Sequence, residues 1–134
     1  MTCKGDEGAA TVRIGVVSAA WVSDIDGSYQ DYKAPQVDMF LVLLFDAANQ
    51  GPKPLTSIYT DEHAFIGLQL QDDKGRAYRP YSIGFLLNEA AATYGGSTDY
   101  YPRQLPGVTT RYIRVFQVNK DAQSVKLVNS SVRC

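Results

Sequence analysis

His63 is the only histidine in the sequence, so any Ser-His-Asp or Cys-His catalytic site would have to include it. It follows Asp61 and Glu62 directly before a predicted strand, where an exposed polar side chain is the ordinary outcome. No Gly-x-Ser-x-Gly elbow surrounds a serine. The acidic residues also show no spacing that would bring two carboxylates together for glycoside hydrolysis. We therefore predict that the chain is not an enzyme and needs no cofactor.

Metal binding has one candidate segment. Zinc would need several Cys or His ligands, and one histidine with two cysteines cannot supply a conventional set. Asp24, Asp26 and Asp31 place three carboxylates within eight residues, and carboxylate oxygens suit calcium. The EF-hand pattern is not met. We therefore interpret these acids as turn formers and predict no metal, with calcium binding as the alternative.

Five of the nine tyrosines fall in predicted loops. Tyrosine offers a large, fairly rigid contact area with a polar tip, which is typical of binding loops. These rings either pack over the edge of the domain and seal its core, or bind a partner. A row of exposed, coplanar tyrosines would indicate a sugar ligand, whereas an exposed apolar patch would indicate a protein. The five candidates are Tyr29, Tyr32, Tyr94, Tyr100 and Tyr101.

The two cysteines, Cys3 and Cys134, are separated by almost the whole sequence. If they were paired, the closed loop would stabilise the fold by about 4–5 kcal/mol in the chain-entropy model. The sequence does not show whether they come close enough to pair. Two free thiols are the alternative, and Cys3 has a third interpretation that depends on a family resemblance.

Length and charge narrow the class of protein. A chain of 134 residues fits one domain, which we predict over 11–134, after a flexible linker over 1–10. The net charge is −1 and the charges form no basic patch, so nucleic acid is not an expected partner. No apolar run approaches the roughly 18–20 residues of a membrane span. The polar segment Met1–Ala10 has no hydrophobic core, so the sequence as given carries no signal peptide.

The first half of the chain is predicted to contain two strands. Residues Thr11–Ser18 alternate between apolar and small or polar side chains, and a bend follows at Ala19 and Ala20. Trp21 is predicted to lie in the core. Ser23–Pro35 is predicted to be a loop. Val37–Phe45 is apolar on both faces, which indicates a central strand or one that is covered on both sides.

A hairpin is the most distinct local pattern. Ala64–Gln71 alternates as a strand, Asp72–Gly75 has the composition of a tight turn, and Ala77–Tyr81 is the return strand. Residues 82–93 have helical spacing that Ser82 could cap, with an irregular strand as the alternative.

Tyr94–Pro106 is predicted to be a long loop, and two strands follow at Val108–Val118 and Ser124–Val128. Several short strands with turns between them indicate an all-β fold. We expect an antiparallel, immunoglobulin-like β-sandwich with one short helix in a crossover near 83–92.

Three motifs in this order resemble a known family. An Asn-containing turn, Ala47–Gly51, follows the central strand, and the hairpin carries the pattern Asp72-x-x-Gly75-x-x-Tyr78. Pro106-Gly107 then precedes a strand that ends around Phe116. From about Val12 to Val128 the sequence resembles an uncharacterised family of telokin-like, immunoglobulin-like domains common in bacterial lipoproteins and secreted proteins.

The resemblance implies a role outside the cytoplasm and no catalytic residues. Such domains commonly follow a lipid-modified cysteine, for which Cys3 and the polar stretch Lys4–Ala10 are the matching positions, although nothing hydrophobic precedes Cys3. We therefore expect a secreted or lipid-anchored, non-catalytic binding or accessory module of the cell envelope. It would contact a protein partner through loops or a sheet edge, and the alternative is a carbohydrate-binding sandwich that uses the loop tyrosines.

Overall fold

Strand β5 (Asp38–Asn49) is the centre of the fold, and it contains all of the strand predicted over Val37–Phe45 except Val37. The computed structural model describes residues 2–5, 11–26, 32–52, 68–80, 84–98, 105–129 and 132–133. Strand β5 pairs antiparallel with β2 (Thr11–Val22) on one side and with β8 (Thr109–Asn119) on the other. Two short strands, β1 (Thr2–Gly5) and β10 (Val132–Arg133), complete a five-stranded main sheet in the order β10-β1-β2-β5-β8.

Both faces of β5 are buried, as the sequence predicted. Alternate residues contribute to two separate hydrophobic cores. Leu41, Leu43 and Phe45 belong to the first core, and Phe40, Val42 and Leu44 belong to the second. Because side chains along a strand point to opposite faces in turn, a strand that is apolar at every position needs a cover on each side.

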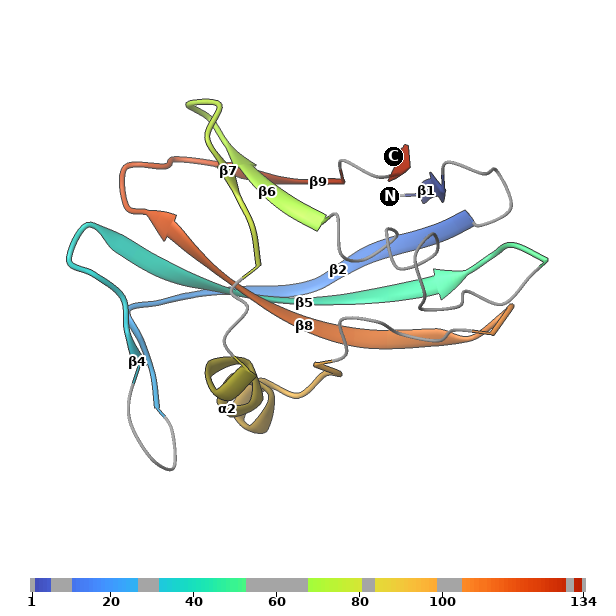
Figure 1. Cartoon of the computed structure of the whole chain (residues 1–134), viewed down its shortest axis with the longest axis horizontal. Helices are drawn as coiled ribbons and strands as arrows, with labels where there is room; N and C mark the ends of the chain where they lie inside the picture. Colours follow the sequence, from blue (N-terminus) through green and yellow to red (C-terminus); the bar gives the residue numbers. More distant parts are fainter. Residues whose placement is uncertain are drawn as a thin grey trace.

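A second sheet covers the first core. It has the strand order β7-β6-β9, with β6 at Leu68–Asp72, β7 at Ala77–Tyr78 and β9 at Val125–Asn129. The predicted hairpin is confirmed, and Gly75 in its turn has a φ of 80°. Partly buried Val125 and Leu127 pack against the first core from β9. Figure 1 shows this sheet on one side of the main sheet.

Helix α2 (Gly84–Tyr94) lies on the opposite side of the main sheet (Figure 1). Leu86, Leu87 and Ala90 are buried in the second core, with the spacing of one helical face. The amide of Gly95 donates to the carbonyl of Ala91 (2.8 Å), and Gly95 has a φ of 85°, so a glycine in the left-handed region ends the helix. The helical interpretation of this segment is confirmed. Ser82, its predicted cap, lies outside the described residues.

Strands β3 (Asp24–Ile25) and β4 (Tyr32–Lys33) form a small hairpin beside the helix. Ile25 is buried in the second core, which explains why part of the segment predicted to be a loop is ordered as strand. Residues 2–5 also differ from the prediction, because this part of the predicted linker pairs with β2 and β10 as β1.

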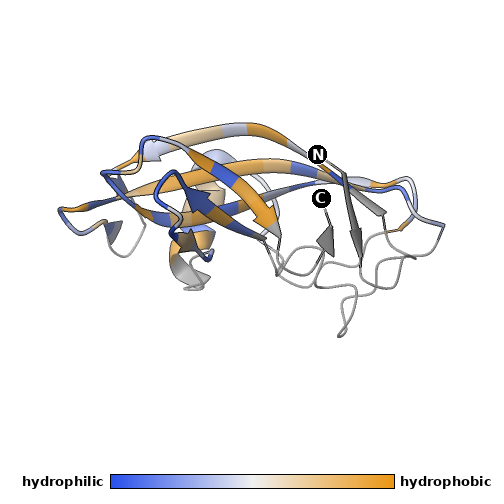
Figure 2. Cartoon of the chain, turned by 90° about the horizontal axis from the view of Figure 1, so that it is seen from above, coloured by the Kyte–Doolittle hydropathy of each residue, from blue (hydrophilic) through white to orange (hydrophobic). Residues whose placement is uncertain are grey.

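The predicted antiparallel β-sandwich with one short helix is therefore confirmed. Figure 2 shows hydrophobic stretches along the strands of the main sheet and hydrophilic turns between strands. Within the described ranges, no helix is long and apolar enough to cross a membrane.

The Asn-containing turn Ala47–Gly51 and the Pro106-Gly107 turn meet at one end of the main sheet. The Asn49 side-chain oxygen accepts a hydrogen bond from the Gly51 amide (2.9 Å), which shapes the turn after β5. The Gly107 amide donates to the Asn49 carbonyl (2.8 Å), and Gly107 has a φ of 80°. The Pro-Gly turn before β8 therefore docks on the turn that follows β5.

Candidate docking edge on strand β2

Strand β2 presents a backbone edge that no described strand covers. Its inner edge pairs with β5 from Val12 to Val22. Its outer edge pairs with β1 only as far as Arg13. From Gly15 to Val22 the outer edge has no strand partner in the described part of the chain. An edge of this kind offers a row of backbone N–H and C=O groups to an incoming extended segment.

This open stretch carries exposed apolar side chains. Val16 is 58% exposed, Val17 44% and Trp21 45%. These three make up half of the large, exposed hydrophobic side chains identified in the described residues; the others, Val37, Leu105 and Val108, lie elsewhere in the chain. An apolar patch concentrated on one sheet edge is typical of an interaction surface.

The register places the apolar side chains on one face. Val16, Ala19 and Trp21 lie directly opposite residues of β5 that point into the first core. Directly opposite residues in an antiparallel pair project to the same side of the sheet. The three side chains therefore extend the first core's face to the edge of the sheet, where no further strand covers them among the described residues. We call the exposed residues Val16, Val17, Ala19 and Trp21 the β2 stripe.

The prediction that Trp21 lies in the core is wrong. Its neighbour across the sheet, Leu41, is buried, so the ring is on the predicted side of the strand. The indole stays exposed because β2 is at the edge at this point. Sequence alternation identified the face, but only the pairing of distant strands decides whether that face is covered.

A β-bulge interrupts β2 between Val16 and Ser18, so Val17 has no partner on β5. The extra residue reverses the alternation, because even-numbered residues face the first core before the bulge and odd-numbered residues face it afterwards. We predicted an interruption at Ala19 and Ala20, and the structure places it two to three residues earlier. The strand continues to Val22.

The open edge also lacks charge. Between Arg13 and Asp24 there is no ionisable side chain. Natural sheet edges are commonly protected by lysine, by proline or by bulges, and this one has only the bulge. Its composition suits the addition of an extended peptide by main-chain hydrogen bonds, with apolar side chains for specificity.

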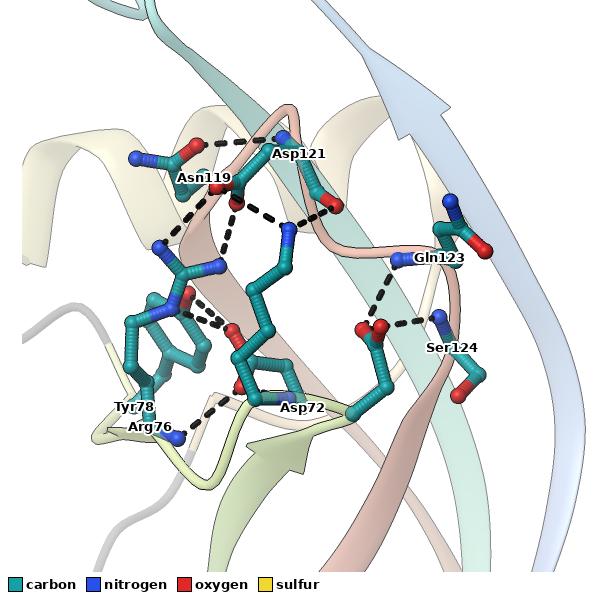
Figure 3. A network of polar contacts seen from close by, with 9 residues as sticks. Asp72, Arg76, Tyr78, Asn119, Asp121, Gln123 and Ser124 are labelled. Carbon is teal, nitrogen blue, oxygen red and sulfur yellow. Dashed lines mark hydrogen bonds and ion pairs between the residues drawn. The ribbon is translucent and has the colours of Figure 1, made fainter.

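A dense polar cluster is centred on Asp72 in the β6–β7 hairpin (Figure 3). This carboxylate accepts hydrogen bonds from the amides of Lys74 (2.9 Å) and Arg76 (2.9 Å). It also accepts from the Arg76 Nε (2.6 Å) and from the Tyr78 hydroxyl (2.7 Å). These bonds give a physical reason for the Asp-x-x-Gly-x-x-Tyr pattern, since Asp72 holds the turn that Gly75 makes and Tyr78 closes it.

The cluster is poorly suited to acid–base catalysis. Burial alone would raise the pKa of Asp72, but the hydrogen bonds from Tyr78, Arg76 and Lys74 outweigh it and hold the pKa well below its usual range. A general acid–base catalyst works best with a pKa near the working pH. The pKa of Tyr78 is raised, first by burial and then by its bond to Asp72. Both shifts stabilise the protonation states that already exist at neutral pH.

The same cluster joins two turns. Arg76 also forms an ion pair with Asp121 in the β8–β9 turn, and Lys74 donates to the Asp121 carbonyl oxygen (3.0 Å). The Asp73 carboxylate accepts from the Gln123 amide (2.9 Å) in the same turn. The hairpin is thus tied to the connection between the two sheets, as Figure 3 shows. We interpret the cluster as structural.

A shallow hollow of about 540 Å³ lies on the opposite face of the main sheet, where Gly15 faces Asp46 across the strands. Asp46 forms a two-pronged ion pair with Arg111, with distances of 2.9 and 3.2 Å. The hydrogen bond from Arg111 lowers the pKa of Asp46. The carboxylate in this hollow is therefore already paired with a cation.

The predicted binding tyrosines are only partly within the described residues. Tyr32 and Tyr94 are half-buried and pack against the second core. Tyr29, Tyr100 and Tyr101 lie outside the described ranges. The structure therefore brings two of the five to the core, and their use in binding stays a prediction.

The other candidate positions lie only partly within the described residues. Asp24 and Asp26 are exposed at the β3–β4 hairpin, while Asp31 and His63 lie outside the described residues. Among the residues that the structure describes, no group of three His, Cys, Asp or Glu is placed to hold a metal ion. Cys3 is in β1, where its backbone pairs with Val12.

The comparisons with known proteins identify the fold. No protein family and no curated protein sequence matches the chain. A conserved hypothetical protein from Bacillus anthracis has a similar structure, with a TM-score of 0.65 and 17% identity over 87% of this chain and 80% of that one. An uncharacterized beta-sandwich protein from Clostridium difficile 630 has a TM-score of 0.50 and 11% identity over 90% of this chain and 80% of that one. The chain is therefore structurally similar to uncharacterised bacterial β-sandwich proteins.

Proposed function

We propose that this domain is a non-catalytic binding module that takes up an extended segment of a protein partner along the open edge of β2. The observation that carries the proposal is the β2 stripe, an exposed apolar row on an uncharged sheet edge from Gly15 to Val22. The partner strand would supply main-chain hydrogen bonds, and its apolar side chains would pack beside Val16 and Trp21.

The chemistry of the edge favours protein over carbohydrate. Sugar binding by stacking needs exposed aromatic rings beside polar groups, and the described tyrosines are half-buried or buried: Tyr32, Tyr78, Tyr94 and Tyr112. The exposed side chains of the β2 stripe are aliphatic except for Trp21. An apolar exposed patch is the feature expected of a protein contact.

The absence of catalysis is part of the same proposal. The carboxylates with lowered pKa values, Asp72, Asp73, Asp46 and Asp121, are each held by hydrogen bonds or by a basic side chain. Such groups have little affinity for a proton at neutral pH and are poor general bases.

The proposed location is outside the cytoplasm, in or near the cell envelope. Support comes from the resemblance to telokin-like domains of secreted proteins and lipoproteins, which is carried by the three motifs described above. Cys3 is where a lipid would attach in such a protein.

Photocrosslinking in the native host tests the docking edge. A photoreactive amino acid in place of Ala19 lies in the middle of the β2 stripe. The same residue in place of Val37, which is 64% exposed and lies outside β2, is the matched control. We expect a discrete crosslinked protein from position 19 and none from position 37.

Two further variants distinguish specific binding at this edge from nonspecific hydrophobic adhesion. Trp21→Lys should abolish the crosslink from position 19, and Val37→Lys should leave it intact. Equal crosslinking from both positions, or a crosslink at position 19 that survives Trp21→Lys, would show that the edge is not a specific docking site.

A further inference from the structure

The open edge of β2 has limits at both ends. Strand β1 covers the same edge as far as Arg13. At the other end β2 stops at Val22, and the chain bends at Ser23. From Gly15 to Val22 the described chain supplies no strand to this edge. The edge therefore has room for one extended segment as long as this stretch itself.

The β-bulge makes the two halves of this stretch equivalent. In an antiparallel ladder, residues alternate between those whose N–H and C=O groups point toward the neighbouring strand and those whose groups point away from it. Val16 lies opposite Phe45 and Trp21 lies opposite Leu41, an even number of positions apart on β5. Val16 and Trp21 therefore share one backbone direction and one face, that of the first core. Without the extra residue of the bulge, the odd step from Val16 to Trp21 would give them opposite directions and opposite faces.

This equivalence makes the stretch complementary to itself. A second copy that runs antiparallel along the edge places its Trp21 opposite Val16 of the first copy, and its Val16 opposite Trp21. Opposed residues of an antiparallel pair must share a face and a backbone direction, and these two do. Gly15 and Val22 form the next pair outward, since their partners on β5 are also an even number of positions apart. Both copies thus use the whole open stretch.

The centre of the stretch is small. Ser18, Ala19 and Ala20 lie between the two apolar pairs. Both copies are bulged there, so the ladder is interrupted at the two-fold axis. The short side chains leave room for the two backbones to pass.

The charges that flank the stretch are opposite in sign. Arg13 lies before it and Asp24 after it, both side chains are exposed, and no ionisable side chain lies between them. Arg13 lines the hollow on the face opposite the first core, and Asp24 is next to Ile25, which is buried in the second core on that same face. An antiparallel second copy brings its Asp24 toward Arg13 at each end of the contact, and no charge has to be buried between them.

We propose that the partner strand at this edge is β2 of a second copy of the chain, so that two main sheets join into one sheet across a two-fold axis. The inference rests on the proposed function, because it names the partner of the same edge. A foreign segment would not require the edge to match itself in register, face and flanking charge. An isologous contact requires all three, because one surface supplies both sides of it.

The first experiment measures the mass of the purified whole chain by analytical ultracentrifugation over a range of concentrations. We expect a monomer–dimer equilibrium. Trp21→Lys should abolish the dimer, because it puts a charge into both apolar pairs, whereas Val37→Lys should leave the dimer Kd unchanged. A monomer at every concentration, or a dimer that survives Trp21→Lys, would overturn the inference.

Charge reversal tests the antiparallel arrangement without touching the apolar pairs. Arg13→Asp or Asp24→Arg alone places like charges at both ends of the contact and should raise the dimer Kd about tenfold at low salt. The double variant makes the charges opposite again and should return the Kd close to that of the wild type. A double variant that dimerises no better than the single variants contradicts this arrangement.

The crosslinking experiment from position 19 separates the two proposals. A product that joins two copies of this chain supports both. A crosslink to a different protein, together with a purified chain that stays monomeric, rejects the second copy and leaves the docking edge in place. No crosslink from position 19 rejects both.

Discussion

Asp72 shows how one side chain can organise a turn and connect it to the rest of the domain. All four of its donors lie within six residues of it in the sequence, so these hydrogen bonds could be predicted from the hairpin motif. The ion pair between Arg76 and Asp121 could not be predicted in this way, because the two residues are separated by 44 others and meet only in the folded chain.

Removing this carboxylate should be costly. Asp72→Ala removes one acceptor from two backbone amides, the Arg76 guanidinium and the Tyr78 hydroxyl, so we expect a Tm lower by about 5–10 °C. Differential scanning calorimetry measures it. Lys74→Ala is the control, because its ion pair with Asp121 (3.2 Å) is half-exposed and should change Tm by less than about 3 °C. Equal effects of the two changes would contradict a central role for Asp72.

The same residue predicts a pH dependence. The pKa of Asp72 is lowered in the folded state, so its contribution to stability is present above the unfolded value of about 3.9 and is lost as the pH falls below it toward the folded pKa. Tm should therefore decline as the pH falls below about 4. Asp72→Asn should flatten part of that decline, which circular dichroism across the acid range would detect. Parallel curves for the two proteins would assign the acid sensitivity to other groups.

Gly96 and Gly15 differ in how much space a side chain would find around them. A Cβ at Gly96 would lie 3.0 Å from Leu44 Cδ2 and 3.1 Å from the Ile113 backbone nitrogen, and Gly96 has a φ of 92°. Gly96→Ala should therefore destabilise the fold by about 1–3 kcal/mol, as chemical denaturation would measure. At Gly15 nothing lies within 4 Å of an added Cβ, so Gly15→Ala should change little. A neutral Gly96→Ala would mean that the segment after α2 does not pack this closely on the sheet.

At the scale of elements, β2 has two regions with different surroundings. Its first residues are enclosed by β1 and β5, while the stretch after Arg13 has β5 on one side only within the described chain. The bulge at Val17 then sets which side chains of this stretch face the first core. The β2 stripe is thus a product of pairing and of one inserted residue.

The exposure of Trp21 predicts a separation between stability and binding. Trp21→Lys should change the free energy of unfolding by no more than about 1 kcal/mol, because the ring is 45% exposed. Phe45→Ala, at a fully buried position, should cost about 3–5 kcal/mol. Urea denaturation of both variants makes the comparison. A loss of several kcal/mol for Trp21→Lys would show that the indole supports the core and would weaken its role in docking.

At the scale of the whole molecule, one sheet separates two cores. β5 has strand partners on both edges and is covered on both faces, whereas β2 is open on one edge after Arg13 in the described structure. Within the described residues, the buried strand β5 is therefore next to a strand that is open on one edge. A module can bind along such an edge without disturbing its own core.

Hydrogen exchange should reveal this arrangement. Amides of β5 should exchange only through global unfolding, while the outward-facing amides of β2 between Gly15 and Val22 should exchange much faster. Binding of a partner strand should slow those β2 amides selectively. Strong protection of the whole of β2 in the free protein would mean that its outer edge is already covered.

The features that could be predicted from the sequence are those that depend on neighbouring residues. Apolar residues on both faces of Val37–Phe45 predicted a central strand or one covered on both sides, and helical spacing favoured a short helix near 83–92, where α2 lies at Gly84–Tyr94. The turn chemistry of Asp72 and Gly75 predicted the hairpin. In each case the controlling interactions lie within a few residues, where periodicity and turn propensity are reliable physical guides.

Long-range strand pairing sets which described strand is at an edge, where β2 is bulged, and whether Trp21 is exposed. It also brings Arg76 to Asp121, and the two ends of the sequence into one ladder. These features depend on which distant segments lie side by side. Side-chain alternation tells a strand's two faces apart, but it carries no information about what lies beside the strand, and that is what separates a core residue from a docking residue.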